Sequence, residues 1–284
     1  MGLPDHQTGT VATDDVELFY RRFGNAGEAP LLILHGLSYF SYDWIPVASQ
    51  LAAGGRDVVA MDMRGFGESA WSPSQAYGVG DFAGDCLAVA DALGWGAFDL
   101  MGHSMGGRNA TWCAAENPDR IKSLILCDYS PVNAKEGSMR VTRTVAGVPD
   151  SFAAIDDALA YFGKDTGLAA DDPHRLRMEA YLKKTGDGYT IKRDTYHRER
   201  FQAVLDGKAA GGGPDMWAAL AKVACPTLVV RGTRSDMFAA ENVAKVKDTN
   251  ANIALVEVDA SHDVAGDAPE ALITEVTKFL GDRS

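Results

Sequence analysis

Short, largely apolar runs alternate along most of the chain with segments whose apolar residues recur at helical spacing. A short run that is wholly or largely apolar predicts a strand that is buried on both faces. We expect strands at 31–34, 57–61, 97–101, 123–127, 226–231 and 253–258. We expect helices between and after these runs, at 44–53, 81–93, 108–115, 241–248 and 268–280.

The order of these elements predicts the fold class. Two β-rich runs lie within 8–23 on either side of Asp14 and Asp15, which is the pattern of a hairpin. Together with the later runs, they predict an α/β fold with a mostly parallel eight-stranded sheet. Parallel strands are joined by crossover helices, so helices should cover both faces of that sheet. Functional sites of such folds lie at the carboxyl ends of the strands.

The alternation of strands and helices stops between 133 and 214. This stretch predicts helices joined by polar loops, for example at 152–162 and 173–184. We therefore expect a mostly helical lid at 133–214. It would be inserted into a core that is formed by 1–132 and 215–284.

One turn in the middle of the chain has the pattern of a catalytic site. Gly102-His103-Ser104-Met105-Gly106 matches G-x-S-x-G and joins the expected strand at 97–101 to the expected helix at 108–115. The two glycines have no Cβ atom, so strand and helix can close tightly around the serine. The alternative is an ordinary glycine-rich turn, but the strand–turn–helix context favours Ser104 as a nucleophile.

Composition and charge exclude several classes of protein. The 284 residues are 46% hydrophobic and 23% charged, as in globular proteins. The net charge of −12 disfavours nucleic acid or an anionic membrane as a partner. We see no membrane span and no signal peptide, which favours a cytoplasmic location. The four cysteines show no metal-ligand spacing, and no motif implies a metal or a cofactor.

The motifs and their order resemble the α/β-hydrolase superfamily over nearly the whole chain. The matching signatures are His35-Gly36, Asp62-x-Arg64-Gly65-x-Gly67-x-Ser69, Gly102 to Gly107, and Ser261-His262. Within the superfamily the chain is similar to bacterial catabolic and ring-cleavage hydrolases. The string 102–109, followed by Asp-Tyr-Ser-Pro at 128–131, resembles the (acetamidomethylene)succinate hydrolase branch most. The resemblance implies a serine hydrolase fold with a lid over the active site.

A serine nucleophile needs a base, and His262 has the best claim among six histidines. It follows the last expected strand in a polar loop before the final helix. His35 resembles a structural histidine of the family's oxyanion loop, and His103 lies inside the serine turn itself. The alternative for His262 is a surface or capping residue.

Two aspartates compete for the acid that orients the histidine. Asp236 follows the strand at 226–231, which is the usual place in the superfamily. The family pattern has the acid three residues after a glycine, but Asp236 comes four residues after Gly232, and Ser235 occupies the expected position. Asp128 follows the preceding strand, where the branch named above takes its acid. We favour Asp128 and keep Asp236 as the alternative.

The remaining candidates concern the oxyanion and the substrate. The backbone N–H groups of Met105 and Leu37 are the expected oxyanion donors. The lid is nearly neutral while the rest of the chain is acidic, so the lid would repel an anionic substrate less. Candidate contacts to a substrate carboxylate or pocket wall are Arg108, Tyr39, Arg140 and Arg143. For any single arginine the plainer alternative is a solvated helix face.

The leading hypothesis from the sequence is a cofactor-free serine hydrolase with a Ser-His-Asp triad. Its substrate would be a small ester, lactone, amide or C–C bonded compound, including carboxylate-bearing ones. The rival hypothesis is a non-catalytic ligand receptor on the same fold. The intact nucleophile and base favour the enzyme.

Overall fold

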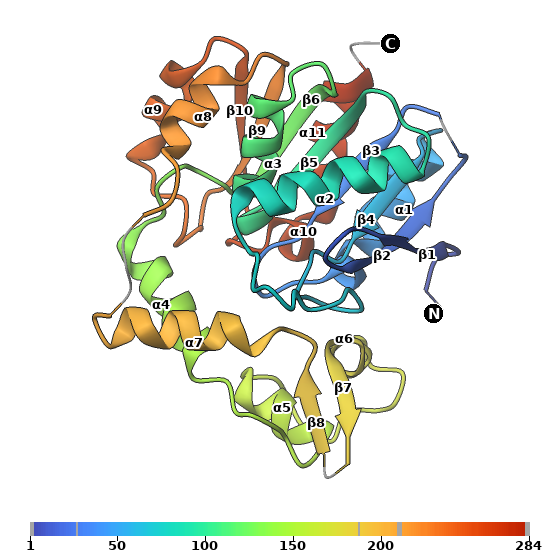
Figure 1. Cartoon of the computed structure of the whole chain (residues 1–284), viewed down its shortest axis with the longest axis vertical. Helices are drawn as coiled ribbons and strands as arrows, with labels where there is room; N and C mark the ends of the chain where they lie inside the picture. The colour runs from blue at the N-terminus through green and yellow to red at the C-terminus, as the bar shows by residue number, and fades with distance from the viewer. Residues whose placement is uncertain (1–2, 27, 187, 209–211, 282–284) are drawn as a thin grey trace.

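The computed structural model describes residues 3–26, 28–186, 188–208 and 212–281, and an eight-stranded sheet forms its centre (Figure 1). The strands are β1 (Gln7–Ala12), β2 (Glu17–Phe23), β3 (Leu31–Leu34), β4 (Val58–Met61), β5 (Phe98–His103), β6 (Ile121–Cys127), β9 (Thr227–Gly232) and β10 (Ile253–Val258). Their order in the sheet is β1-β2-β4-β3-β5-β6-β9-β10. The β1–β2 and β2–β4 pairs are antiparallel, and all other pairs are parallel. This confirms the predicted fold class.

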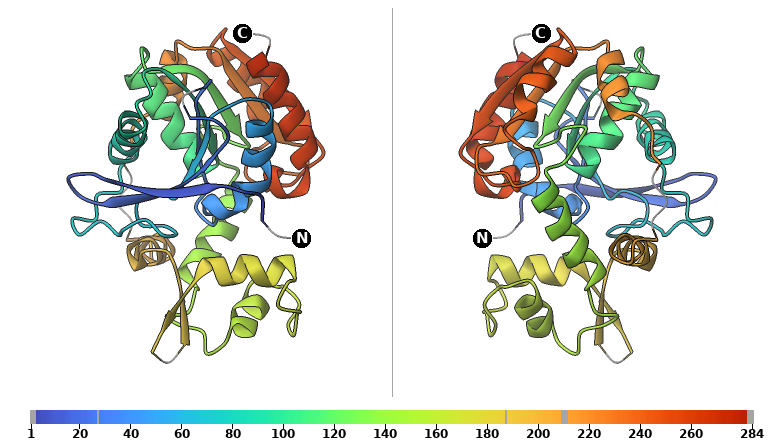
Figure 2. Two further views of the ribbon diagram at one scale, coloured as in Figure 1. Left: turned by 90° about the vertical axis from the view of Figure 1, so that its right-hand side faces the viewer. Right: turned by 90° about the vertical axis from the view of Figure 1, so that its left-hand side faces the viewer.

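Helices cover both faces of the sheet because alternate strand residues point to opposite sides. Leu31 and Ile33 of β3 belong to one hydrophobic core, whereas Leu32 and Leu34 belong to the other. The first core is closed by α1 (Ile45–Ala53), α10 (Val264–Asp267) and α11 (Pro269–Gly281). The second is closed by α2 (Val79–Ala92), α3 (Met105–Glu116), α8 (Met216–Lys222) and α9 (Asn242–Thr249). Figure 2 shows the two layers of helices on either side of the sheet.

The segment between β6 and α8 lies beyond the edge of the sheet, where it forms the lower part of the molecule in Figure 1. Its elements are α4 (Lys135–Ala146), α5 (Ile155–Tyr161), α6 (Pro173–Tyr181), β7 (Leu182–Thr185), β8 (Gly188–Ile191) and α7 (Thr195–Leu205). We call residues 133–214, which contain these elements, the insertion. In the described ranges, no helix has both the length and the apolar character that a membrane span requires.

The insertion differs from the sequence expectation in one respect. The helix expected at 173–184 ends at Tyr181, and the next four residues form β7, which pairs with β8 in an antiparallel hairpin. Helical spacing of apolar residues could not reveal this. A strand of four residues is specified by its partner across the hairpin, and that partner lies beyond Gly186 in the sequence.

Backbone hydrogen bonds join the insertion to the loop that follows β4. The N–H of Gly67 donates to the carbonyl oxygen of Lys192 (2.7 Å), and the N–H of Asp194 donates to that of Gly65 (2.8 Å). Gly65 and Gly67 have φ values of 78° and 60°, which favour glycine. The Tyr77 hydroxyl also donates to the Asp194 carboxylate. The core loop thus fixes the start of α7.

His197, in the first turn of α7, is buried where the insertion meets the core. Its side chain packs against Phe66 and Tyr77, with ring centroids 4.6 and 4.7 Å away. Burial, followed by the positive charges of Arg193 and Arg200, lowers the pKa of His197 to about 3. The imidazole therefore stays neutral in the folded protein at mildly acidic pH.

This burial makes a prediction for stability. An unfolded histidine titrates near pH 6.5, so between about pH 7.5 and 5.5 the unfolded state takes up a proton that folded His197 refuses. The free energy of unfolding should fall over this range. In His197→Gln the fall should be smaller by about 1 kcal/mol than in the wild type. Urea unfolding of the wild type and of His197→Gln at pH 7.5 and 5.5 measures the two falls in the free energy of unfolding. Equal falls would mean that His197 in the folded protein takes up a proton as an exposed histidine does.

Candidate active site

Ser104 occupies a strained turn between β5 and α3. Its φ and ψ are 52° and −114°, a conformation that residues with a side chain rarely adopt. The flanking glycines make room for this turn. A Cβ on Gly106 would lie 2.6 Å from the carbonyl oxygen of His35, and one on Gly102 would lie 2.7 Å from the backbone nitrogen of Gly107. The strand and helix can approach this closely only without those side chains.

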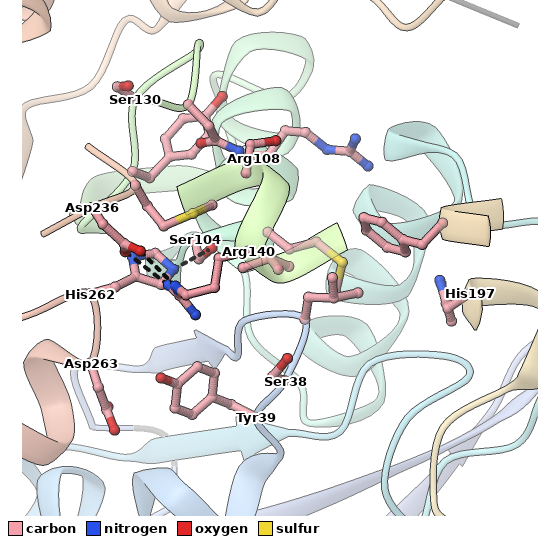
Figure 3. A pocket seen from close by; sticks show the side chains of 18 of the residues that line it. Ser38, Tyr39, Ser104, Arg108, Ser130, Arg140, His197, Asp236, His262 and Asp263 are labelled. Atoms are coloured by element: carbon pink, nitrogen blue, oxygen red, sulfur yellow. Dashed lines mark hydrogen bonds and ion pairs between the residues drawn. The ribbon is translucent and has the colours of Figure 1, made fainter. Parts of the chain in front are cut away.

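The His262 side chain lies between Ser104 and Asp128. It comes from the loop between β10 and α10. Its Nε2 atom is 2.9 Å from the Ser104 hydroxyl oxygen, and its Nδ1 atom is 2.6 Å from Oδ2 of Asp128. Figure 3 shows the contact between the serine and the histidine. The structure therefore brings together three residues from the ends of three different strands.

His103, the residue before Ser104, supports this loop. Its Nε2–H donates to the backbone carbonyl oxygen of His262 at 2.8 Å. Burial, and then the neighbouring His262, lowers the pKa of His103 to about 3. A neutral His103 keeps this bond without adding a second positive charge beside His262.

Asp128 is held by hydrogen bonds on both carboxylate oxygens. Its side chain is fully buried at the end of β6. Oδ1 accepts the backbone N–H of Gly232 at 2.9 Å, and Oδ2 accepts the Ser235 hydroxyl as well as His262. Ser235 is the residue in the position where the family pattern expects the acid. Its hydroxyl instead orients the aspartate on the neighbouring strand.

Asp236, the alternative acid, lies at the rim and binds a different partner. Its two oxygens accept hydrogen bonds from Nε and an NH2 group of Arg140, at 2.6 and 2.8 Å. The bond from Arg140 is the main reason why the pKa of Asp236 is lowered. Figure 3 shows this pair in front of Ser104 and His262. Of the two aspartates, only Asp128 makes a hydrogen bond to His262 within the described residues.

The two expected oxyanion donors border the same cavity as Ser104. Met105 is the first residue of α3, so its N–H has no acceptor within the helix. Leu37 lies in a loop that His35 fixes: His35 Nδ1–H donates to the Gly36 carbonyl (2.7 Å), and Nε2 accepts the N–H of Met63 (3.0 Å). Burial lowers the pKa of His35 to about 4, which keeps the acceptor nitrogen free of a proton.

The cavity has a volume of about 620 Å³ and lies between the core and the insertion. Insertion residues on its wall are Asn133, Ser138, Arg140, Val141, His197, Arg200, Phe201 and Val204. Of the candidate substrate contacts, Tyr39, Arg108 and Arg140 line it. Arg143 does not: it is exposed on α4 and is absent from the wall. The sequence does not indicate how α4 is rotated about its axis, so it could not separate Arg143 from Arg140.

Several residues on the cavity wall were not candidates from the sequence, and three of them are polar side chains that matter for what the cavity can bind. They are Tyr129, His197 and Arg200. Arg200 belongs to a run with Arg198 and several other charged residues, and only the orientation of α7 distinguishes the two arginines. Within the described residues, no group of three His, Cys, Asp or Glu side chains could hold a metal ion. The four cysteines are buried free thiols.

Comparisons with known proteins agree with this architecture. The model of the α/β-hydrolase fold family matches residues 29–269. The 2-(acetamidomethylene)succinate hydrolase of Mesorhizobium japonicum is 28% identical over 257 residues, which are 89% of each chain. The N-formylmaleamate deformylase of Pseudomonas putida is 25% identical over 274 residues, which are 96% of each chain.

A solved structure shows the same similarity in three dimensions. The crystal structure of E-2-(acetamidomethylene)succinate hydrolase superposes with a TM-score of 0.84 and 26% identity. The superposition covers 98% of this chain and all of the other. The family model spans most of the sequence. The similar proteins are named as hydrolases, and they match this chain over nearly their whole length. This chain therefore belongs to the α/β-hydrolase fold family and is a hydrolase.

Proposed function

We propose that the chain is a cofactor-free serine hydrolase in which Ser104, His262 and Asp128 act as a catalytic triad. One observation carries the proposal. Two consecutive hydrogen bonds, of 2.9 and 2.6 Å, link the Ser104 hydroxyl through the His262 imidazole to a buried carboxylate, on the wall of a cavity large enough for a small substrate. In the proposed reaction, a small ester, lactone, amide or C–C bonded compound is cleaved through an acyl-enzyme.

In the first step, the Ser104 oxygen attacks the substrate carbonyl carbon, and His262 Nε2 takes the serine proton. The imidazolium that forms gains its stability from Asp128, which accepts the Nδ1–H. Asp128 needs no rearrangement for this role, because Gly232 and Ser235 already fix its two oxygens. The carbonyl oxygen becomes negatively charged and would lie against the N–H groups of Met105 and Leu37.

In the second step, the proton on His262 passes to the leaving group as the bond to the carbonyl carbon breaks. Water then enters the cavity, gives a proton to His262 and attacks the acyl-enzyme carbonyl. Collapse of that intermediate releases the acid and returns the proton to Ser104. Each oxyanion donor of this kind typically contributes about 3 kcal/mol to transition-state stabilisation.

The size of the cavity and the similar proteins support a small substrate. A volume of about 620 Å³ is within the usual range for small-molecule sites. Two similar proteins are named for 2-(acetamidomethylene)succinate and N-formylmaleamate, which are small compounds. Both names are compatible with cleavage of an acyl–nitrogen bond, so amides belong in the first substrate panel beside esters.

The first prediction from the proposed mechanism concerns the nucleophile. Ser104→Ala should lower the turnover of p-nitrophenyl acetate by several orders of magnitude, because no other group replaces the attacking oxygen. A fluorophosphonate probe should label the wild type at Ser104 and leave the variant unlabelled. Thermal unfolding of both proteins checks that the fold is intact. A variant that keeps a tenth of the activity would disprove the role of Ser104, and a wild type with neither labelling nor turnover would favour a receptor.

The second prediction separates the two aspartates with matched substitutions. Asp128→Asn should lower kcat by up to about 10⁴-fold, because the amide favours the wrong tautomer of His262. Asp236→Asn makes the same chemical change at the rim and should lower kcat less than about tenfold, since Asp236 binds Arg140 instead. Steady-state kinetics on one ester measures both. Equal large losses, or a larger loss in Asp236→Asn, would contradict the choice of Asp128.

A further inference from the structure

Three buried polar side-chain atoms without a hydrogen-bond partner belong to residues of the cavity wall. Within the described residues, Nε of Arg108, the hydroxyl of Tyr129 and Nε2 of His197 are buried and have no partner. Tyr129 and His197 are only 5% and 4% exposed. The nearby Thr111 hydroxyl donates its proton to the Gly107 carbonyl at 2.8 Å, so it cannot also donate to the Tyr129 hydroxyl. Buried polar groups are rarely left unpaired, and a polar ligand in this part of the cavity would complete their hydrogen bonding.

The charges around the cavity leave the same region positive. The rim arginine Arg140 is paired with Asp236, and Arg234 is paired with Asp259 and Asp267. Arg108 and Arg200 form no ion pair with an acidic group in the described part of the chain. Burial, and then the charge of Arg200, lowers the pKa of Arg108, which shows that the two guanidinium groups affect each other. An anion between them would relieve this repulsion.

The donors present at this wall fit a carboxylate. A guanidinium group offers parallel N–H donors that match the two oxygens of a carboxylate. Burial raises the pKa of Tyr129, so its hydroxyl keeps its proton and can donate as well. His197 is neutral and adds no competing charge. Within the cavity, the acidic side chains are Asp236 and Asp263, and Figure 3 shows both on the side of Ser104 and His262 opposite to His197.

We propose that Arg108, Tyr129 and Arg200 form an anion subsite that binds a carboxylate of the substrate. The inference rests on the proposed serine hydrolase function and adds a substrate class to it: monoesters or monoamides of short dicarboxylic acids. The α3 helix sets the distance between Ser104 and Arg108. Arg108 comes four residues after Ser104, which corresponds to about 6 Å along the helix axis. Figure 3 shows its guanidinium pointing away from His262, toward the side where His197 lies. The carboxylate would thus lie a few bonds from the carbonyl that Ser104 attacks.

The test compares two ethyl esters that differ only at the end of the acyl chain away from the ester group. Monoethyl glutarate has a carboxylate where ethyl 5-methylhexanoate has an isopropyl group, and a pH-stat follows the hydrolysis of both. We expect a higher kcat/KM for monoethyl glutarate in the wild type. Arg108→Met should lower the ratio of the two kcat/KM values at least tenfold, mainly through KM, and Arg108→Lys should restore part of it. A wild type without preference, or a ratio unchanged in Arg108→Met, would overturn the subsite.

Matched substitutions on α7 provide the control. Arg200→Met should lower the same ratio about threefold, because this arginine is exposed and its charge is partly screened by solvent. Arg198→Met removes the same charge two residues away, where the arginine binds Asp150 outside the cavity, and should leave the ratio unchanged. Equal effects of the two substitutions would indicate general attraction by the positive helix and would contradict a specific site.

A binding measurement separates failure of the subsite from failure of the proposed function. Glutarate should bind to Ser104→Ala in a calorimeter, and adding Arg108→Met should weaken this binding at least tenfold. Neither result requires turnover. If the wild type hydrolyses neither ester and the probe does not label Ser104, the hydrolase mechanism fails while glutarate binding still tests the subsite. If both esters are hydrolysed but glutarate binds equally well with and without Arg108, the subsite alone is wrong.

Discussion

The close packing of α3 against β5 is the constraint on which the site depends. The backbone of Gly106 approaches the carbonyl oxygens at the end of β3, and Gly102 approaches the first turn of α3. The chain can reverse from strand to helix in this space only if the residue between them takes a positive φ. Ser104 is that residue, at 52°. The turn stores strain, which the buried strands and helices on both faces of the sheet hold in place.

The parallel sheet then determines what this serine can meet. The strands β6, β9 and β10 lie successively beyond β5, and neighbouring strands are about 4.8 Å apart. A histidine after β10 can therefore be reached by an acid from β6 or from β9. Here the acid that contacts His262 comes from β6, and the loop after β9 supplies Ser235 and Gly232 as donors to it. The loop after β9 thus supports the aspartate, although the carboxylate that contacts His262 comes from the end of β6.

The sequence was sufficient to predict those features that depend on local patterns. Largely apolar runs located the parallel strands, and the spacing of glycines around Ser104 located the turn. The offset of Asp236 from Gly232 indicated that this loop differs from the family pattern. The hairpin β7–β8 was missed because its strands are short and depend on each other. The rotation of α4 and α7 was also out of reach, so Arg140 could not be separated from Arg143, or Arg200 from Arg198.

The features that the sequence predicted and the features that it missed lie in two different parts of the molecule. The proposed triad is built from strand ends whose relative positions follow from the sheet, and such positions are strongly specified by the hydrophobic pattern. Another part of the cavity wall combines Arg108 of α3 and Tyr129, which follows β6, with Arg200 from the insertion. Its geometry depends on how the insertion is joined to the core at Gly65, Gly67 and Asp194. Changes in the insertion can therefore reshape this wall while the strand ends that carry the proposed triad stay in place, and such separation of wall and strand ends lets one fold support many functions.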